Sequence, residues 1–246
     1  MSNVACHSVK RGLTGLLMCL ALSGTIIEAH AQVGHPPESS PYTRLRAKRV
    51  ISLGAGYMAG SPGSAGVGPA NGPLVAARFN LSLTRPLDLD VNLGVANLDR
   101  GIIDPSTAPT DSIVDTAKQT VTLLDAGLVL KLTGQKTWHR TIPYLGLSLG
   151  VALGGNVQAD SLSGFSFKTQ FQLSPGLGVR WYPSDRLMIR VDFRDVIWRL
   201  SYPPSFFTLP EDDPLAPPVL NPNVRDDSEW THHPTLTLTL GYAIGF

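Results

Sequence analysis

Carboxylates and imidazoles gather near the C-terminus, where they are the side chains of this 246-residue chain best suited to chemistry. The group comprises Asp226, Asp227, Glu229, His232 and His233, with Glu211, Asp212 and Asp213 upstream. Such oxygen and nitrogen atoms can hold a divalent cation. The stretch also contains many prolines and has no fixed ligand spacing, so we expect a solvated acidic loop with no bound metal.

A hydrolytic set is the second chemistry to weigh, because Ser201 and Ser228 accompany the two histidines. A serine nucleophile needs a base within hydrogen-bond reach and an acid that orients the base. No predicted strand carries a matched serine and histidine on one face. The glycine-rich stretch 54–72 also lacks the Gly-Lys-Ser/Thr ending of a phosphate loop. We therefore predict no catalytic residue, no cofactor and no enzyme activity.

Residues 1–31 have the features of a cleaved export signal. Lys10 and Arg11 form its positive region, an apolar run follows over 13–22, and small residues precede a cut after Ala31. The apolar run is too short to span a bilayer as a helix. Residues 32–47, rich in proline and serine, are predicted to be an extended periplasmic lead-in, and the fold proper would occupy residues 48–246.

Both cysteines, Cys6 and Cys19, lie inside the predicted signal, so the mature chain would have no thiol chemistry. A lipid-anchored Cys19 is the alternative, but bulky residues precede it at 16–18, where lipoprotein signals carry a small residue. Removal of the signal leaves 18 basic and 18 acidic side chains. A formally neutral chain lacks the electrostatic basis for nucleic-acid binding.

Eight segments of the mature chain alternate strictly between apolar and polar or small residues. A period of two is that of a β-strand and cannot be produced by a helix over this length. The segments are residues 50–58, 74–84, 87–97, 120–132, 144–154, 165–181, 187–194 and 235–246. An even number of such strands can close into a barrel.

The connections between these segments alternate in length. Those after the second, fourth and sixth segments are short, and the others are longer and rich in glycine, proline and aspartate. This asymmetry predicts an all-β fold, an eight-stranded antiparallel up-and-down transmembrane β-barrel with short periplasmic turns and longer extracellular loops. Both ends of the barrel chain would lie on the periplasmic side.

Alternation alone does not say which row of side chains faces outward, and a secreted lipocalin-like carrier would turn its apolar row inward. The polar row is rich in glycine, serine and threonine, which would make room in a narrow interior for charged side chains from other strands. We therefore expect the apolar row, Phe165 and Phe167 included, to face lipid. The interior would hold Arg78, Asp88, Asp90, Asp125, Lys131, Lys168, Arg180, Arg190, Asp192 and Arg194.

Aromatic residues fall near the predicted strand ends, where two interfacial girdles are expected in a membrane barrel. The predicted girdle residues are Tyr57, Trp138, Trp181, Trp198, Tyr202 and Trp230. The predicted interior is slightly basic. It could be a plug held by ion pairs or a narrow wetted path, and the sequence leaves both open.

The export signal, the eight segments and the C-terminal TLTLTLGYAIGF resemble those of the small eight-stranded outer-membrane barrels of the OmpA, OmpX and OmpW kind, over about residues 48–246. The resemblance implies the outer membrane of a Gram-negative-type bacterium and surrounding outer-membrane lipid. It also implies recognition by the barrel-assembly machinery through Tyr242, Ile244 and Phe246. Fold does not settle function in such a family.

Two functions remain open at this point. The first is a non-enzymatic barrel with a structural or surface-interaction role through its outer loops, chiefly residues 202–231, toward an unknown surface partner. The alternative is a narrow, porin-like passive channel for small solutes. In a channel, Arg78, Arg180, Arg190 and Arg194 would give a mild preference for anions.

Overall fold

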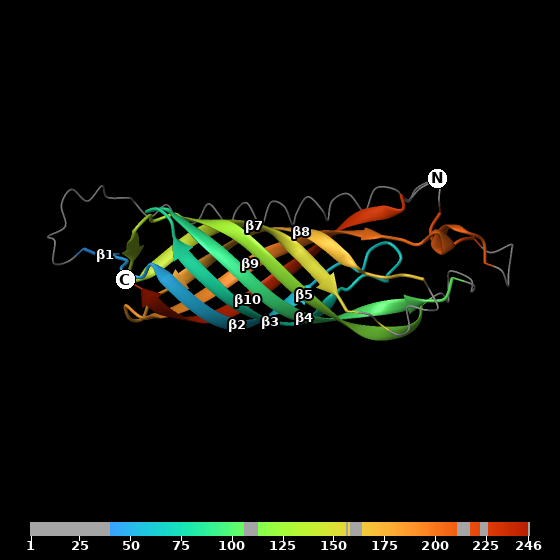
Figure 1. Cartoon of the computed structure of the whole chain (residues 1–246), viewed down its shortest axis with the longest axis horizontal. Helices are drawn as coiled ribbons and strands as arrows, with labels where there is room; N and C mark the ends of the chain where they lie inside the picture. Colours follow the sequence, from blue (N-terminus) through green and yellow to red (C-terminus); the bar gives the residue numbers. More distant parts are fainter. Residues whose placement is uncertain are drawn as a thin grey trace, which may run out of the picture. The chain divides into compact units, whose positions relative to one another are not determined.

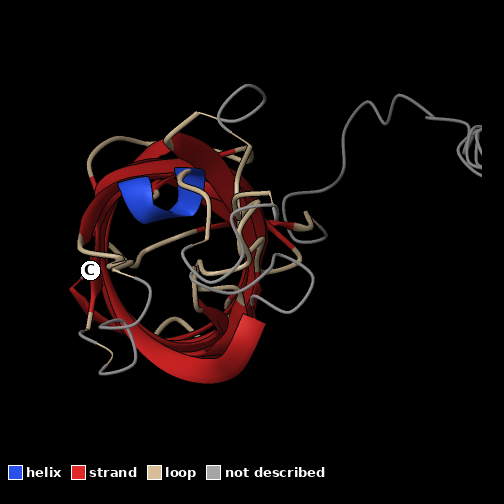
Figure 2. Cartoon of the chain, turned by 90° about the vertical axis from the view of Figure 1, so that its right-hand side faces the viewer, coloured by secondary structure: helices blue, strands red, loops and turns tan. Residues whose placement is uncertain are grey.

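The eight alternating segments form antiparallel strands that close into a ring, so the predicted all-β barrel is confirmed (Figures 1 and 2). Each strand pairs with its neighbours, and the last one closes the ring by pairing with the first. The strands are β2 (Arg49–Ala59), β3 (Asn71–Ser82), β4 (Leu87–Ile103), β5 (Ile113–Lys131), β7 (Thr141–Gly154), β8 (Thr169–Trp181), β9 (Leu187–Ser201) and β10 (Ser228–Gly245).

The structure is a computed structural model that describes residues 40–105, 113–155, 157, 164–210, 217–221 and 226–245. The predicted signal, the first half of the predicted lead-in (residues 32–39), the carboxylates at 211–213 and Phe246 lie outside these residues. The barrel belongs to the unit Pro41–Phe246. Within the described residues, no helix has the length and apolar character needed to cross a membrane.

Two short strands stand outside the ring. β1 (Tyr42–Arg44) pairs antiparallel with β6 (Lys136–Trp138), which lies in the connection between β5 and β7. The end of the predicted lead-in is thereby joined to the barrel, and Ala47 is buried beneath it. These strands lie at the same end of the barrel as the C-terminus (Figure 1).

Loop lengths follow the predicted alternation. The turns 83–86 and 182–186 are short and lie at the end that carries β1, which we call the periplasmic end. The connections that follow β2, β4, β7 and β9 begin at the opposite, outer end. A short 3₁₀ helix, η3 (Pro204–Phe207), belongs to the last of these connections, and its Phe206 is fully buried. Figure 2 shows this helix within the outline of the strand ring when the barrel is viewed from the outer end.

The apolar row faces outward and is exposed, while the polar row faces the interior. On β10, for example, Leu236, Leu238 and Leu240 are exposed, and the threonines between them are buried. The outward apolar side chains of all eight strands together form a continuous belt. An exposed apolar surface of this extent around a closed barrel is the surface that outer-membrane barrels present to lipid. The protein is an outer-membrane β-barrel.

The prediction was wrong for Phe165 and Phe167, which are buried inside the barrel. Strand β8 begins only at Thr169, and Lys168 adopts a left-handed backbone with φ of 51°. That residue breaks the two-residue period, so the phenylalanines before it point to the opposite side from Phe171. The side chain of Lys168 is exposed and does not enter the interior as predicted.

The outer ends of four strands are longer than predicted. β4 and β5 pair as far as Ile103 and Ile113, and β9 and β10 pair as far as Ser201 and Ser228. Backbone pairing therefore continues past the apolar belt. Residues 228–231, predicted as loop, are part of strand β10.

The interior has three layers, which the inward side chains of β9 show in order. Met188 belongs to an apolar layer at the periplasmic end, Arg190, Asp192 and Arg194 form part of a charged layer, and Trp198 belongs to an apolar layer at the outer end. We call the first the periplasmic apolar cluster; it comprises Ala47, Val50, Ile142, Tyr182, Met188 and Ala243. The outer apolar cluster includes Met58, Leu98, Val121, Phe165, Phe167, Trp198, Leu200 and Phe206.

Candidate functional site

The charged layer lies between the two apolar clusters, and its charged side chains come from five strands. The structure places nine of the ten predicted lumen residues in it, and Lys168 is the exception. They are Arg78 from β3, Asp88 and Asp90 from β4, Asp125 and Lys131 from β5, Arg180 from β8, and Arg190, Asp192 and Arg194 from β9. All are buried except Arg194, whose side chain is 11% exposed.

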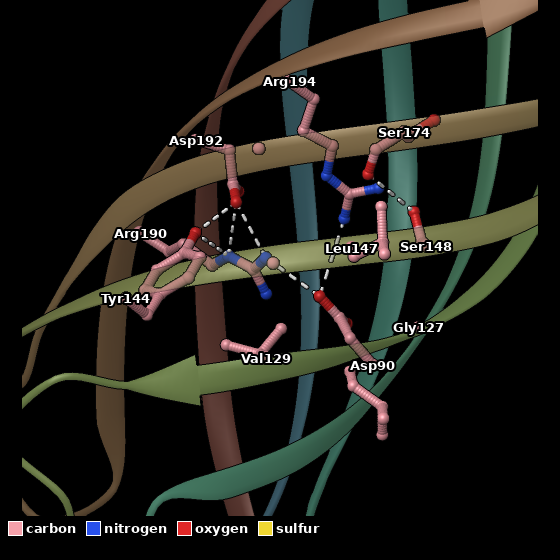
Figure 3. A pocket seen from close by; sticks show the side chains of 13 residues that line it. Asp90, Gly127, Val129, Tyr144, Leu147, Ser148, Ser174, Arg190, Asp192 and Arg194 are labelled. Carbon is pink, nitrogen blue, oxygen red and sulfur yellow. Dashed lines mark hydrogen bonds and ion pairs between the residues drawn. The ribbon is translucent and has the colours of Figure 1, made fainter.

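Asp192 is bound by several side chains of the layer, and Figure 3 shows its hydrogen bonds with Arg190 and Tyr144. Arg190 donates to its Oδ1 atom from Nε at 2.9 Å and from Nη2 at 2.7 Å. Arg78 donates to Oδ2 from Nη1 at 2.5 Å. The Tyr144 hydroxyl also donates to Oδ1. Two guanidinium groups and a hydroxyl therefore bind one carboxylate, and these three groups come from three different strands.

Two further carboxylates extend this group. Asp90 Oδ2 lies 2.9 Å from Arg190 Nη2 and 3.5 Å from Arg194 Nη2. Asp125 Oδ1 lies 3.2 Å from Arg194 Nη1. Amide side chains donate further hydrogen bonds to these two carboxylates. Asn80 donates to Asp90 at 2.8 Å, and Asn92 and Gln172 donate to Asp125 at 2.8 and 3.3 Å.

A second carboxylate centre forms around Asp88. Lys131 Nζ lies 2.6 Å from its Oδ1 atom, and Arg180 Nη1 lies 2.6 Å from its Oδ2 atom. The Ser82 hydroxyl also bonds to Oδ1, at 2.7 Å. Both oxygens are thus paired with a cation, and β3, β4, β5 and β8 are joined across the barrel.

Tyr144 is a member of the layer that the sequence analysis did not single out. Its ring lies 4.9 Å from the guanidinium carbons of both Arg180 and Arg190, a distance suited to cation–π attraction. A signal for it was present, since residue 144 shares the even-numbered parity of Gly146 and Ser148, which face the interior. An aromatic residue in the row that faces the interior is predicted to pack inside the barrel.

Each of the four carboxylates of the charged layer is paired with at least one cation. Isolated charges are costly to bury, and pairing with hydrogen bonds offsets that cost. The cavity beside Arg190, Ser148 and Ser174 has about 20 Å³ of space for water, which suffices for about one molecule. Because both ends of the layer are capped by apolar clusters, the described interior offers no continuous wetted path.

The predicted girdle residues divide into two sets. Tyr57, Trp138, Trp181 and Trp230 point outward and are about half exposed. Trp198 and Tyr202 are instead buried in the outer apolar cluster, so the expectation for these two was wrong. The same parity that turns Arg190 and Asp192 inward also turns Trp198 inward. A stacked contact with His233, with ring centroids 3.9 Å apart, fixes the indole there.

The C-terminal histidines and carboxylates do not converge on one site. His232 points outward and pairs with Asp195 at 2.7 Å, whereas His233 is buried. Ser228 lies four residues from His232 on the same strand, which separates them by about 13 Å. Among the described residues, no group of three or more His, Cys, Asp or Glu could hold a metal ion.

Glu229 has a structural role at the outer end. Its carboxylate accepts hydrogen bonds from the Ser64 backbone and from the Ser64 hydroxyl, the latter at 2.7 Å, and from the Tyr202 hydroxyl. Burial and the neighbouring Glu229 carboxylate raise the pKa of Tyr202, so its hydroxyl stays protonated and remains a donor. The connection after β2 is thereby tied to the connection after β9.

No protein-family model and no curated protein sequence matches the chain. Its structure is similar to solved outer-membrane barrels. Neisserial surface protein A is 13% identical, with 80% of this chain and 97% of that chain covered and a TM-score of 0.49. The N-terminal barrel domain of OprF from Pseudomonas aeruginosa is 12% identical, with 80% and 98% covered and a TM-score of 0.44. The outer-membrane protein AlkL, solved in lipid bilayers, is 13% identical, with 87% of this chain and 97% of that chain covered and a TM-score of 0.43. At these identities the similarity concerns the fold alone.

Proposed function

We propose that the protein is a non-enzymatic outer-membrane barrel with a structural and surface-interaction role, performed by the part that extends beyond the lipid. The observation that carries this proposal is the closed interior. Paired charges fill the middle of the barrel, and apolar side chains close both of its ends. A barrel with such an interior is a rigid support rather than a channel.

The outer end supplies the surface for such a role. Asp99 of β4 pairs with Asn71, the first residue of β3, and β4 continues for four more residues paired with β5. The β4–β5 hairpin therefore extends farther toward the outside than strand β3. Ile113 and Val114 at the start of β5 are exposed, as is Leu209 in the connection after β9. Exposed apolar side chains among polar neighbours are typical of interaction surfaces. The surface extends the predicted loop 202–231 to the β4–β5 hairpin.

The biogenesis partner is also part of the proposal. Tyr242 and Ile244 point outward from the last strand and are about half exposed, where a folding factor at the barrel edge could contact them. We propose that these two residues, with Phe246, are read by the barrel-assembly machinery.

The experiment that tests the closed interior is conductance of the refolded mature protein in a planar lipid bilayer, with unequal salt on the two sides. We expect insertion without conductance steps, because no wetted path crosses the charged layer. Reproducible steps with an anion-leaning reversal potential would instead support the narrow passive channel, in which Arg78, Arg180, Arg190 and Arg194 would set the preference.

A further inference from the structure

The periplasmic end of the barrel carries a ring of exposed arginines, which has no part in the closed interior or in the outer surface. We call this set the periplasmic arginine ring; it comprises Arg44, Arg46, Arg49, Arg85, Arg140 and Arg186. They come from β1, the segment before β2, the start of β2, the β3–β4 turn, the β6–β7 turn and the β8–β9 turn. Basic residues therefore surround this end on every side.

Little negative charge accompanies the ring. Of the carboxylates in the part of the chain that the structure describes, only Asp185 is exposed at this end. The outer end carries both signs, with exposed Asp99, Asp115, Asp226 and Asp227 together with exposed Lys118, Lys168 and Arg199. The molecule is thus electrically polarised along its axis although its net charge is close to zero.

The ring lies at the depth of lipid headgroups. Arg49 is on the same face of β2 as the lipid-facing Ile51 and two residues beyond it, about 7 Å along the strand. Arg140 lies in the turn that joins the exposed Trp138 to Thr141, which pair with each other. Thr141 also pairs with the exposed Trp181 on the neighbouring strand. Tryptophan at a membrane–water interface marks the boundary between hydrocarbon and headgroups.

Three of the arginines also line a pocket. It has a volume of about 110 Å³ and is walled by Arg44, Arg46 and Arg140, with Thr43, Thr137 and Asp185. Arg140 is oriented by a hydrogen bond to the Pro183 carbonyl. Among the described residues, no ion pair involves any of these three arginines. Three guanidinium groups facing one carboxylate give a concave site with excess positive charge.

We propose that this end of the barrel binds anionic phospholipid headgroups of the periplasmic leaflet, with one phosphate held in the pocket between Arg44, Arg46 and Arg140. The guanidinium fork matches phosphate oxygens in pairs, which favours arginine over lysine for this contact. A ring continuous around the lipid-facing belt suits a membrane leaflet, whereas a free anion would need only the pocket. Clustered basic residues at a membrane surface attract anionic lipid. The proposal holds whether or not the interior conducts.

The test is lipid retention by the detergent-solubilised mature protein, measured by native mass spectrometry with phosphatidylglycerol, phosphatidylcholine and inorganic phosphate as separate probes. We expect phosphatidylglycerol to be retained more tightly than phosphatidylcholine by about tenfold or more, since each basic residue contributes several-fold. The preference should weaken at high salt because screening reduces attraction between exposed charges.

Two variants localise the effect. The pocket variant Arg44→Gln/Arg46→Gln/Arg140→Gln should lose most of the preference for phosphatidylglycerol. The control variant Lys118→Gln/Lys168→Gln/Arg199→Gln removes three exposed cations at the outer end and should keep it. A further variant, Arg85→Gln/Arg186→Gln, leaves β1 and β6 intact and should weaken the preference even if the pocket variant does not fold.

Three results would overturn the proposal. The first is equal retention of phosphatidylglycerol and phosphatidylcholine by the unmodified protein. The second is an equal loss of preference in the pocket and outer-end variants. The third is inorganic phosphate that binds as tightly as phosphatidylglycerol, which would make the pocket a site for free anions and not for lipid.

Discussion

At the scale of single residues, Arg190 contacts three members of the charged layer, Asp192, Asp90 and Tyr144. Arg190→Leu would leave Asp90 and Asp192 buried with fewer cations. Because breaking a buried pair costs about 3–5 kcal/mol, we expect the free energy of unfolding to fall by about that amount. Urea unfolding in lipid vesicles, followed by tryptophan fluorescence, measures it.

The matched control for Arg190→Leu is Arg199→Leu, which lies on the same strand. The side chain of Arg199 is exposed and donates a hydrogen bond to the Ser228 hydroxyl. Exposed substitutions of this kind change stability by about 0.5 kcal/mol or less. Equal destabilisation by the two substitutions would contradict a charged layer whose ion pairs stabilise the barrel. A channel would respond to Arg190→Leu mainly through its ion selectivity.

Glycine at position 178 is required by the neighbouring ring. A Cβ atom there would overlap the Tyr144 hydroxyl group and lie 2.5 Å from the Val191 carbonyl oxygen. Overpacking of a tight interior costs about 1–3 kcal/mol, so Gly178→Ala should lower the midpoint of urea unfolding. Gly146→Ala is the control, because the nearest atom to its Cβ would be Val129 Cγ2, at 3.6 Å. Equal effects would show that the Tyr144 contact does not limit the space.

At the scale of elements, period two was enough to predict the eight strands, their order and the two faces. It failed where the period breaks or where its continuation was overlooked. The left-handed Lys168 reverses the phase before β8, which no local composition marks. Trp198 could have been placed inward by counting on from Arg190. The layering of apolar and charged inward residues depends on contacts between distant strands, so the sequence pattern does not contain it.

Strand β10 carries a prediction that separates assembly from stability. Tyr242→Ser/Ile244→Ser should reduce the amount of assembled barrel in cells several-fold, because both side chains point outward near the chain end where recognition is proposed. Leu236→Ser/Leu238→Ser is the control on the same strand and face. Assembly is measured by heat-modifiable migration of membrane fractions, and refolding of both variants in vesicles from urea gives the intrinsic effect. A loss in cells matched by an equal loss of refolding would contradict a recognition role.

At the scale of the whole molecule, the interior is closed three times in series, by the periplasmic apolar cluster, the charged layer and the outer apolar cluster. Ions need every layer to be open, so opening one layer should not produce conductance. We expect Trp198→Ala/Phe206→Ala, which removes two large side chains of the outer cluster, to stay silent in planar bilayers. Arg190→Ala/Asp192→Ala should also stay silent, since the outer cluster remains.

A combined variant that adds Tyr182→Ala and Met188→Ala to these four substitutions also removes two large side chains of the periplasmic apolar cluster, so that all three layers are opened. Conductance steps are expected from this variant. The order of events decides between the two functions: steps in the unmodified protein mean a channel, and steps only in the combined variant mean a plug. Conductance from Trp198→Ala/Phe206→Ala alone would show that the charged layer is wetted, and the ion-pair network would then be the lining of a gated passage rather than a closure.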